Sequence, residues 1–193
     1  MLSKALKPIG TTMYIWGGGW NETDTGAGIE AVTLGVSPTW ANYASQQDVS
    51  YNYKNTRYQI HNGLDCSGYM GWVIYNTLET SNNQPGYVAK ASSMAKELAD
   101  KGLGNYTLAN EVTDWKAGDI MSMNGHVWMV IGNCLDGSVV LVHCSPPGVQ
   151  ICGTLSKIGN ETEASRLARH YMSTYYPNWY NRYPDCTENH SYL

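Results

Sequence analysis

The residue best placed for chemistry is Cys66, which stands at the start of a predicted helix. The N-terminus of a helix carries partial positive charge and backbone N–H groups that have no partner in the helix. Such a setting lowers the pKa of a thiol from about 8.5 to roughly 3.5–7.5, and the thiolate is the nucleophile. The position therefore predicts a reactive cysteine. Taken alone, a cysteine at a helix start is more often a small buried apolar residue of the core.

Two histidines on neighbouring predicted strands could supply the base. His126 opens one strand, where its imidazole could take a proton from sulfur and return it to a leaving amine. A loop over residues 133–136 would place His143 directly opposite His126, whereas a tighter turn at residues 136–137 would keep both on one face but out of contact. In contact, His143 could hold the first ring in its working tautomer. The alternative is a hydrogen-bonded pair of structural histidines.

A zinc site is the other chemistry that these residues could support. Zinc accepts cysteine and histidine, so Cys66, His126 and His143 with a fourth ligand are possible. No pair among them has the local spacing of a zinc motif, and we expect no metal and no cofactor. The five cysteines are odd in number and lack C-x-x-C spacing, which argues against a complete disulfide framework. We expect Cys144 to point opposite to His143 and away from the site. The other thiols are interpreted as structural or incidental: Cys134, Cys152 and Cys186. Three histidines have no chemical context: His61, His170 and His190.

Helices are predicted around these residues. The clearest one covers 66–80, with Asp65 as N-cap and one apolar stripe facing a core. A second is expected from about Ser92 to Lys101, ending at Gly102. A third covers 160–175, with Asn160 and Glu163 as its capping box, and residues 1–9 could form a short helix.

Strands dominate the second half of the sequence. They are predicted at 119–123, 126–131, 138–144 and 149–151, with a hairpin turn at Asn124-Gly125. Because hairpins build antiparallel sheets, the order of elements predicts an α+β fold with an antiparallel sheet. We expect residues 21–60 to form a long loop with little regular structure, and the aromatic tail to pack irregularly.

Five short blocks in this order resemble the NlpC-type cell-wall cysteine peptidases of the papain-like superfamily. The resemblance covers about 12–19 and 62–152. The blocks are YIWGGG at 14–19, DCSGY at 65–69, AGDI at 117–120, GHV at 125–127 and VHCS at 142–145.

The resemblance implies a papain-like NlpC-type fold, in which the helix carrying the cysteine packs on an antiparallel sheet. It implies a thiol protease, a hydrolase of bacterial peptidoglycan, that cuts stem peptides, commonly between D-γ-glutamate and a diamino acid. By position, Cys66 matches the nucleophile, His126 the general base and His143 the orienting residue.

Three further residues match substrate-contacting positions of that family. Tyr14 matches the tyrosine beside the nucleophile, which is often assigned to substrate contact and oxyanion stabilisation. Asp65 and Ser67 match positions that in some members hold the free amine of an N-terminal L-alanine. For Asp65 this role competes with plain helix capping.

The chain departs from the family pattern at two places. Residues 21–60 are an insertion that could reshape the substrate groove, and residues 160–193 extend beyond the usual core. With 193 residues and 21.3 kDa, the chain suits a single catalytic domain over 1–193, which we expect to be a monomer.

Composition excludes some partners. The formal net charge is −4 and no block of Lys or Arg occurs, which argues against nucleic-acid binding. No run approaches the roughly 18 apolar residues of a transmembrane segment, and no secretory leader is visible. If the wall is the substrate, we expect an extracellular or cell-wall location, with a leader or upstream segment trimmed.

Two other functions stay open. One is an amidase that acts on another amide bond. The other is a non-catalytic module that binds glycan or peptide, since the sequence has 15 Tyr and 7 Trp but no Phe. Such rings can either fill a core or offer a stacking surface.

Overall fold

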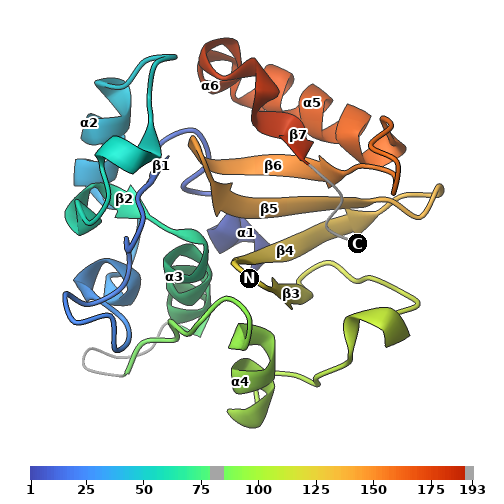
Figure 1. The fold of residues 1–193 in the computed structure, drawn as a ribbon, viewed down its shortest axis with the longest axis horizontal. Helices are drawn as coiled ribbons and strands as arrows, with labels where there is room; N and C mark the ends of the chain where they lie inside the picture. Colours follow the sequence, from blue (N-terminus) through green and yellow to red (C-terminus); the bar gives the residue numbers. More distant parts are fainter. Residues whose placement is uncertain (79–84, 190–193) are drawn as a thin grey trace.

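The fold is a mixed sheet with helices packed on it (Figure 1), and the computed structural model describes residues 1–78 and 85–189. The α-helices are α1 (Leu2–Ala5), α2 (Pro38–Ser45), α3 (Cys66–Leu78), α4 (Met94–Asp100), α5 (Glu163–Tyr175) and α6 (Pro177–Arg182). The strands are β1 (Met13–Tyr14), β2 (Gly63–Leu64), β3 (Ile120–Met123), β4 (His126–Asn133), β5 (Val139–Ser145), β6 (Gly148–Thr154) and β7 (Glu188–Asn189). Short 3₁₀ helices are η1 (Ile29–Val32), η2 (Tyr53–Asn55), η3 (Ile60–Asn62), η4 (Ala109–Glu111) and η5 (Pro184–Thr187). The predicted α+β class is confirmed.

The sheet has the strand order β2-β1-β6-β5-β4-β3, and β7 also pairs with β6. Strands β3 to β6 form the predicted antiparallel meander, with the expected tight turn between Met123 and His126. The prediction of a purely antiparallel sheet is wrong, because β1 pairs parallel with β2 and β6 pairs parallel with β7. Each of these pairs joins segments far apart in sequence, and parallel pairing requires such long connections. Hairpin patterns along the sequence therefore could not reveal it.

Helix α3 begins at Cys66 as predicted, but its surroundings differ from the expected single apolar stripe. Every residue from Cys66 to Asn76 is buried. The sheet covers one side of the helix, and η1 and the segment around Val88 cover others; a Cβ on Gly71 would lie 2.6 Å from the Val88 side chain. The last two residues of the predicted helix lie outside the described residues.

The insertion at residues 21–60 contains more regular structure than we expected. It holds η1, α2 and η2, and the Trp40 ring of α2 packs edge-on against Trp72 of α3 with centroids 6.1 Å apart. The Tyr51 hydroxyl donates a hydrogen bond to the Tyr14 carbonyl at 2.6 Å. The short, polar helices of this region lack strong periodicity, so tertiary contacts decide their structure.

The C-terminal extension is helical, and its helix α5 packs on β6 and β5 (Figure 1). Helix α5 begins later than predicted. Its capping box is Thr162 with Ser165, not Asn160 with Glu163. The aromatic tail, expected to be irregular, forms α6 and η5. Helix α4 and its end at Gly102, which has a φ of 77°, agree with the prediction, whereas the predicted N-terminal helix is confined to α1.

Side chains of β4 and β5 alternate between two hydrophobic clusters. Val127 and Met129 face the cluster that also contains Cys66 and the buried residues of α3. Trp128 and Val130 face a second, smaller cluster that contains Cys152 of β6. Because successive residues of a strand point to opposite faces, the two clusters lie on opposite faces of β4.

Candidate active site

Glycines bring the loop after β1 into direct contact with the start of α3. A Cβ on Gly68 would lie 2.0 Å from the Gly18 carbonyl oxygen, and one on Gly19 would lie 2.6 Å from Gly68 Cα. The backbone N–H of Asp65 donates to the same Gly18 carbonyl at 2.9 Å. Only glycine permits so close an approach. The glycine block thus holds the loop of Tyr14 beside the cysteine.

Asp65 caps α3, as the sequence predicted. Its Oδ1 accepts from the backbone N–H of Gly68 at 2.7 Å and from the Ser67 hydroxyl at 2.9 Å. Burial raises the pKa of Asp65 to about 6, although these hydrogen bonds oppose the shift. The Ser67 Oγ in turn accepts from the indole N–H of Trp20 at 2.9 Å. Asp65 and Ser67, two of the three predicted substrate residues, therefore belong to one hydrogen-bonded group at the helix start.

The thiol of Cys66 lies against the start of β4. The backbone N–H of Val127, the residue after His126, hydrogen-bonds the sulfur and favours its thiolate form. Nevertheless, burial and then the Asp65 charge raise the thiol pKa to about 12. The expected lowering of this pKa is therefore wrong for the resting protein, because desolvation outweighs the helix terminus and the hydrogen bonds.

His126 and His143 are in contact, with Nε2 of the first 2.9 Å from Nδ1 of the second. The expected route to this contact is wrong. Met129 pairs with Val142, and continuing this register to the start of β4 places His126 opposite Ser145 rather than His143. The two rings meet along a diagonal, which long side chains can span. A bulge near Gly132 and a longer turn shifted the register.

Both rings are neutral in the resting site. Burial lowers the pKa of His126 to about 4. Burial, and next the neighbouring His126, hold the pKa of His143 well below its usual range. A neutral imidazole can accept a proton from a thiol that it contacts.

Cys152, interpreted from sequence as structural or incidental, extends the histidine pair. Its Sγ lies 3.1 Å from Nε2 of His143, and its thiol donates to the Cys186 carbonyl at 2.9 Å. His143 pairs with Gln150 across the sheet, so Cys152 shares the face of His143 two residues further on. The strand register would have revealed this contact, but the sequence does not specify that register.

Cys144 lies closer to the site than we expected. It points opposite to His143, as predicted, but that face is the one on which α3 packs. Its thiol donates to the Leu64 carbonyl at 3.0 Å, two residues before Cys66. The prediction that it points away from the site is wrong, because the cluster to which Cys144 points also contains Cys66.

A cavity of about 430 Å³ opens beside Cys66. The Tyr14 ring forms part of its wall and stands edge-on to Tyr53, with centroids 5.4 Å apart. Burial, and next the Cys66 charge, raise the pKa of Tyr14. All of the predicted substrate residues line this cavity: Tyr14, Asp65 and Ser67. Sequence reasoning missed four other lining residues: Trp16, Trp20, Asp24 and Lys90.

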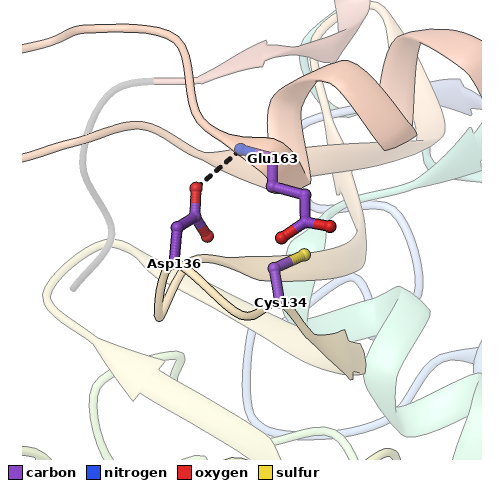
Figure 2. Close-up of side chains that lie close together, drawn as sticks. All are labelled: Cys134, Asp136 and Glu163. Carbon is purple, nitrogen blue, oxygen red and sulfur yellow. Dashed lines mark hydrogen bonds between the residues drawn. The ribbon is translucent and has the colours of Figure 1, made fainter.

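A separate group of potential metal ligands lies at the start of α5 (Figure 2). The ligand atoms of Cys134, Asp136 and Glu163 lie within 4.8 Å of one another. The carboxylates already serve the backbone: Asp136 accepts from the Glu163 N–H at 2.7 Å, and Glu163 accepts from the Leu135 N–H at 3.1 Å. We interpret this group as a helix cap that ties the β4–β5 turn to α5. At the cysteine site, the facing nitrogens of His126 and His143 hydrogen-bond each other.

The sequence predicted no chemical role for three of the histidines. His61 Nδ1 contacts the carboxylate of the buried Glu30 at 2.5 Å. The ring of His170 packs near Tyr171, with centroids 5.9 Å apart. His190 lies outside the described residues.

None of the helices in the described part of the chain is long and apolar enough to cross a membrane. No protein-family model, curated protein or solved structure matches this chain.

Proposed function

We propose that this protein is a cysteine peptidase of the NlpC type with a papain-like arrangement, and that it cleaves amide bonds in peptidoglycan stem peptides. One observation carries the proposal. The Cys66 thiol at the start of α3 hydrogen-bonds the backbone next to His126, whose ring contacts His143 at 2.9 Å. Cys66 comes from α3, His126 from β4 and His143 from β5, and a cavity opens beside Cys66, which supports these three proposed roles.

The reaction follows from these roles. His126 removes the thiol proton as Cys66 sulfur attacks the scissile carbonyl carbon, forming a tetrahedral oxyanion. The backbone N–H of Cys66 stabilises that oxyanion, with Tyr14 beside it. When the C–N bond breaks, His126 returns the proton to the leaving amine. Water, deprotonated by His126, then hydrolyses the thioester and regenerates the thiol.

The electrostatics favour proton transfer during attack rather than before it. Burial raises the pKa of Cys66 to about 12 and lowers that of His126 to about 4, so thiol and imidazole are both neutral at rest. Charge separation in so dry a site is unfavourable until a carbonyl carbon shares the developing charge. The reactive pair is therefore protected until substrate arrives.

The cavity supports a peptide that carries charge. Asp24 and Asp65 present carboxylates and Lys90 an ammonium group, so both an amine and a carboxylate of a substrate find partners. Stem peptides carry both groups, and the resemblance of the motifs points to the bond between D-γ-glutamate and a diamino acid. With the wall as substrate, the protein acts outside a bacterial membrane.

Digestion of defined muropeptides tests the function. Mass analysis identifies which bond opens, and the Cys66→Ala protein serves as the inactive reference. Cleavage after D-γ-glutamate by the wild type alone supports the proposal. Release of intact stem peptide from the sugar indicates an amidase instead. Binding of muropeptides without cleavage by either protein indicates a non-catalytic module, for which Trp16 and Trp20 at the cavity offer stacking surfaces.

A further inference from the structure

A buried chain of polar contacts leads from His126 into the second hydrophobic cluster. His126 Nε2 lies 2.9 Å from His143 Nδ1, and His143 Nε2 lies 3.1 Å from Cys152 Sγ. The Cys152 thiol is 2.9 Å from the Cys186 carbonyl oxygen. His143 and Cys152 are both fully buried. In such a dry environment each of these hydrogen bonds is costly to leave unmade.

The direction of these bonds follows from counting protons. A backbone carbonyl only accepts, so the single S–H of Cys152 is donated to Cys186. The sulfur then faces His143 as an acceptor, which places the proton of the neutral His143 ring on Nε2. Its Nδ1 is left with a lone pair and accepts from His126. The proton of the neutral His126 ring is therefore on Nε2, and its lone pair is on Nδ1.

We infer that Cys152 is a positioning residue that selects the tautomer of His126 through His143. The inference rests on the proposed function, because it assigns Nδ1 of His126 as the atom that takes the Cys66 proton. Without an acceptor at position 152, the proton of His143 can move to Nδ1 and donate to His126. That arrangement puts the His126 proton on Nδ1, where it blocks the base. No oxidation or bond exchange at the Cys152 sulfur is involved.

Nitrogen NMR on the full-length protein tests the tautomer directly. Long-range ¹H–¹⁵N correlation spectra distinguish protonated from unprotonated ring nitrogens, and the His126→Ala spectrum assigns the His126 signals. We expect wild-type His126 to carry its proton on Nε2. A wild-type ring protonated on Nδ1 overturns the inference, whatever the variants do.

Three variants connect the tautomer to catalysis. In Cys152→Ala, we expect the His126 proton to shift to Nδ1 and kcat on muropeptides to fall about 10²-fold or more, with KM little changed. Cys152→Ser keeps a donor for Cys186 and an acceptor for His143, so it should restore the tautomer and most of kcat. Cys134→Ser alters a thiol outside this chain of contacts and should change neither. Cys134 is half-buried near the α5 cap.

The outcomes separate the two proposals. If Cys152→Ala folds and keeps the wild-type tautomer, Cys152 does not select it. If Cys152→Ala fails to fold, the wild-type spectrum and the Cys152→Ser spectrum decide. If the wild type cleaves no muropeptide, the proposed function fails, whereas the NMR result still establishes or refutes the role of Cys152 in the histidine tautomer.

Discussion

The two halves of the candidate site are built differently. On the nucleophile side, Asp65, Cys66 and Ser67 are consecutive residues. They are positioned by the hydrogen bonds of the helix cap, which are local in sequence, and by close backbone contacts that only glycine permits. On the histidine side, His126, His143 and Cys152 come from three strands and meet only through cross-strand register. The nucleophile side borders a cavity, whereas on the histidine side His143 and Cys152 are fully buried and His126 is half-buried.

We infer a division of the proposed roles from this difference. The side that borders the cavity carries the Asp65 carboxylate and the Ser67 hydroxyl, which donates a hydrogen bond to that carboxylate. On the histidine side, His143 and Cys152 are fully buried, so their hydrogen bonds are costly to leave unmade. Breaking the first side should remove chemistry or substrate binding, whereas breaking the second should misplace a proton.

The largest effect is expected at the nucleophile. Cys66→Ala should reduce cleavage of muropeptides by about 10⁴-fold or more, because no other group in the mechanism can form the acyl intermediate. Mass analysis of timed digests measures the loss. Cys134→Ala, which removes a thiol outside the site, is the matched control. Full activity in Cys66→Ala would exclude the proposed mechanism.

The histidine side should show a graded loss. His126→Ala removes the base itself and should lower kcat by about 10³-fold, within the range for general base catalysis. His143→Ala removes only its orienting partner, so we expect a smaller fall in kcat. Steady-state kinetics on a defined muropeptide compares them, with circular dichroism as the check on folding. A greater loss in His143→Ala than in His126→Ala would contradict the assigned roles.

The glycine contact on the nucleophile side should affect stability. Gly68→Ala places a methyl group 2.0 Å from the Gly18 carbonyl oxygen, so the loop or the helix must move. We expect a loss of about 3 kcal/mol or more in the free energy of unfolding, measured in urea. Gly26→Ala meets nothing within 4 Å and should be nearly neutral. Equal stability of the two variants would argue against the close packing of loop and helix.

The smallest effect concerns the Asp65 charge. Its folded pKa of about 6 exceeds the ordinary value of 3.8, so the folded protein binds more protons between these values. Stability should therefore fall as pH rises from about 4 to about 6 and then level off. Asp65→Asn keeps an acceptor for the cap and should be more stable above pH 6 by at most about 3 kcal/mol. Unfolding curves across this pH range measure the difference.

The Asp65→Asn variant also tests whether the Asp65 charge binds substrate. If Asp65 binds a substrate amine, Asp65→Asn should raise KM for muropeptides with a free N-terminal amine while stabilising the fold. An acetylated muropeptide should show no such difference between the two proteins. An unchanged KM for the free amine would leave Asp65 as a helix cap alone.

Local sequence signals predicted much of the fold. The N-cap at Asp65 and the start of α3 follow from residues close in the chain, as do the end of α4 at Gly102 and the turn before His126. The wrong predictions share a different cause. The parallel pairs of β1 with β2 and β6 with β7, the packing of α2 and the capping box of α5 all depend on segments that meet only in the folded chain.

The amino-acid sequence by itself determined which residues could act: a cysteine at a helix start, histidines on adjacent strands and glycines that let a backbone approach closely. Tertiary structure alone decided their contacts and their burial. Burial raised the pKa of Cys66 and lowered that of His126, and both shifts favour the neutral forms. For the thiol, this is opposite to the shift expected from its position at a helix start. A bulged register set the diagonal contact of the histidines and placed Cys152 behind them. Desolvation and strand register depend on the whole chain, so neither can be deduced from neighbouring residues.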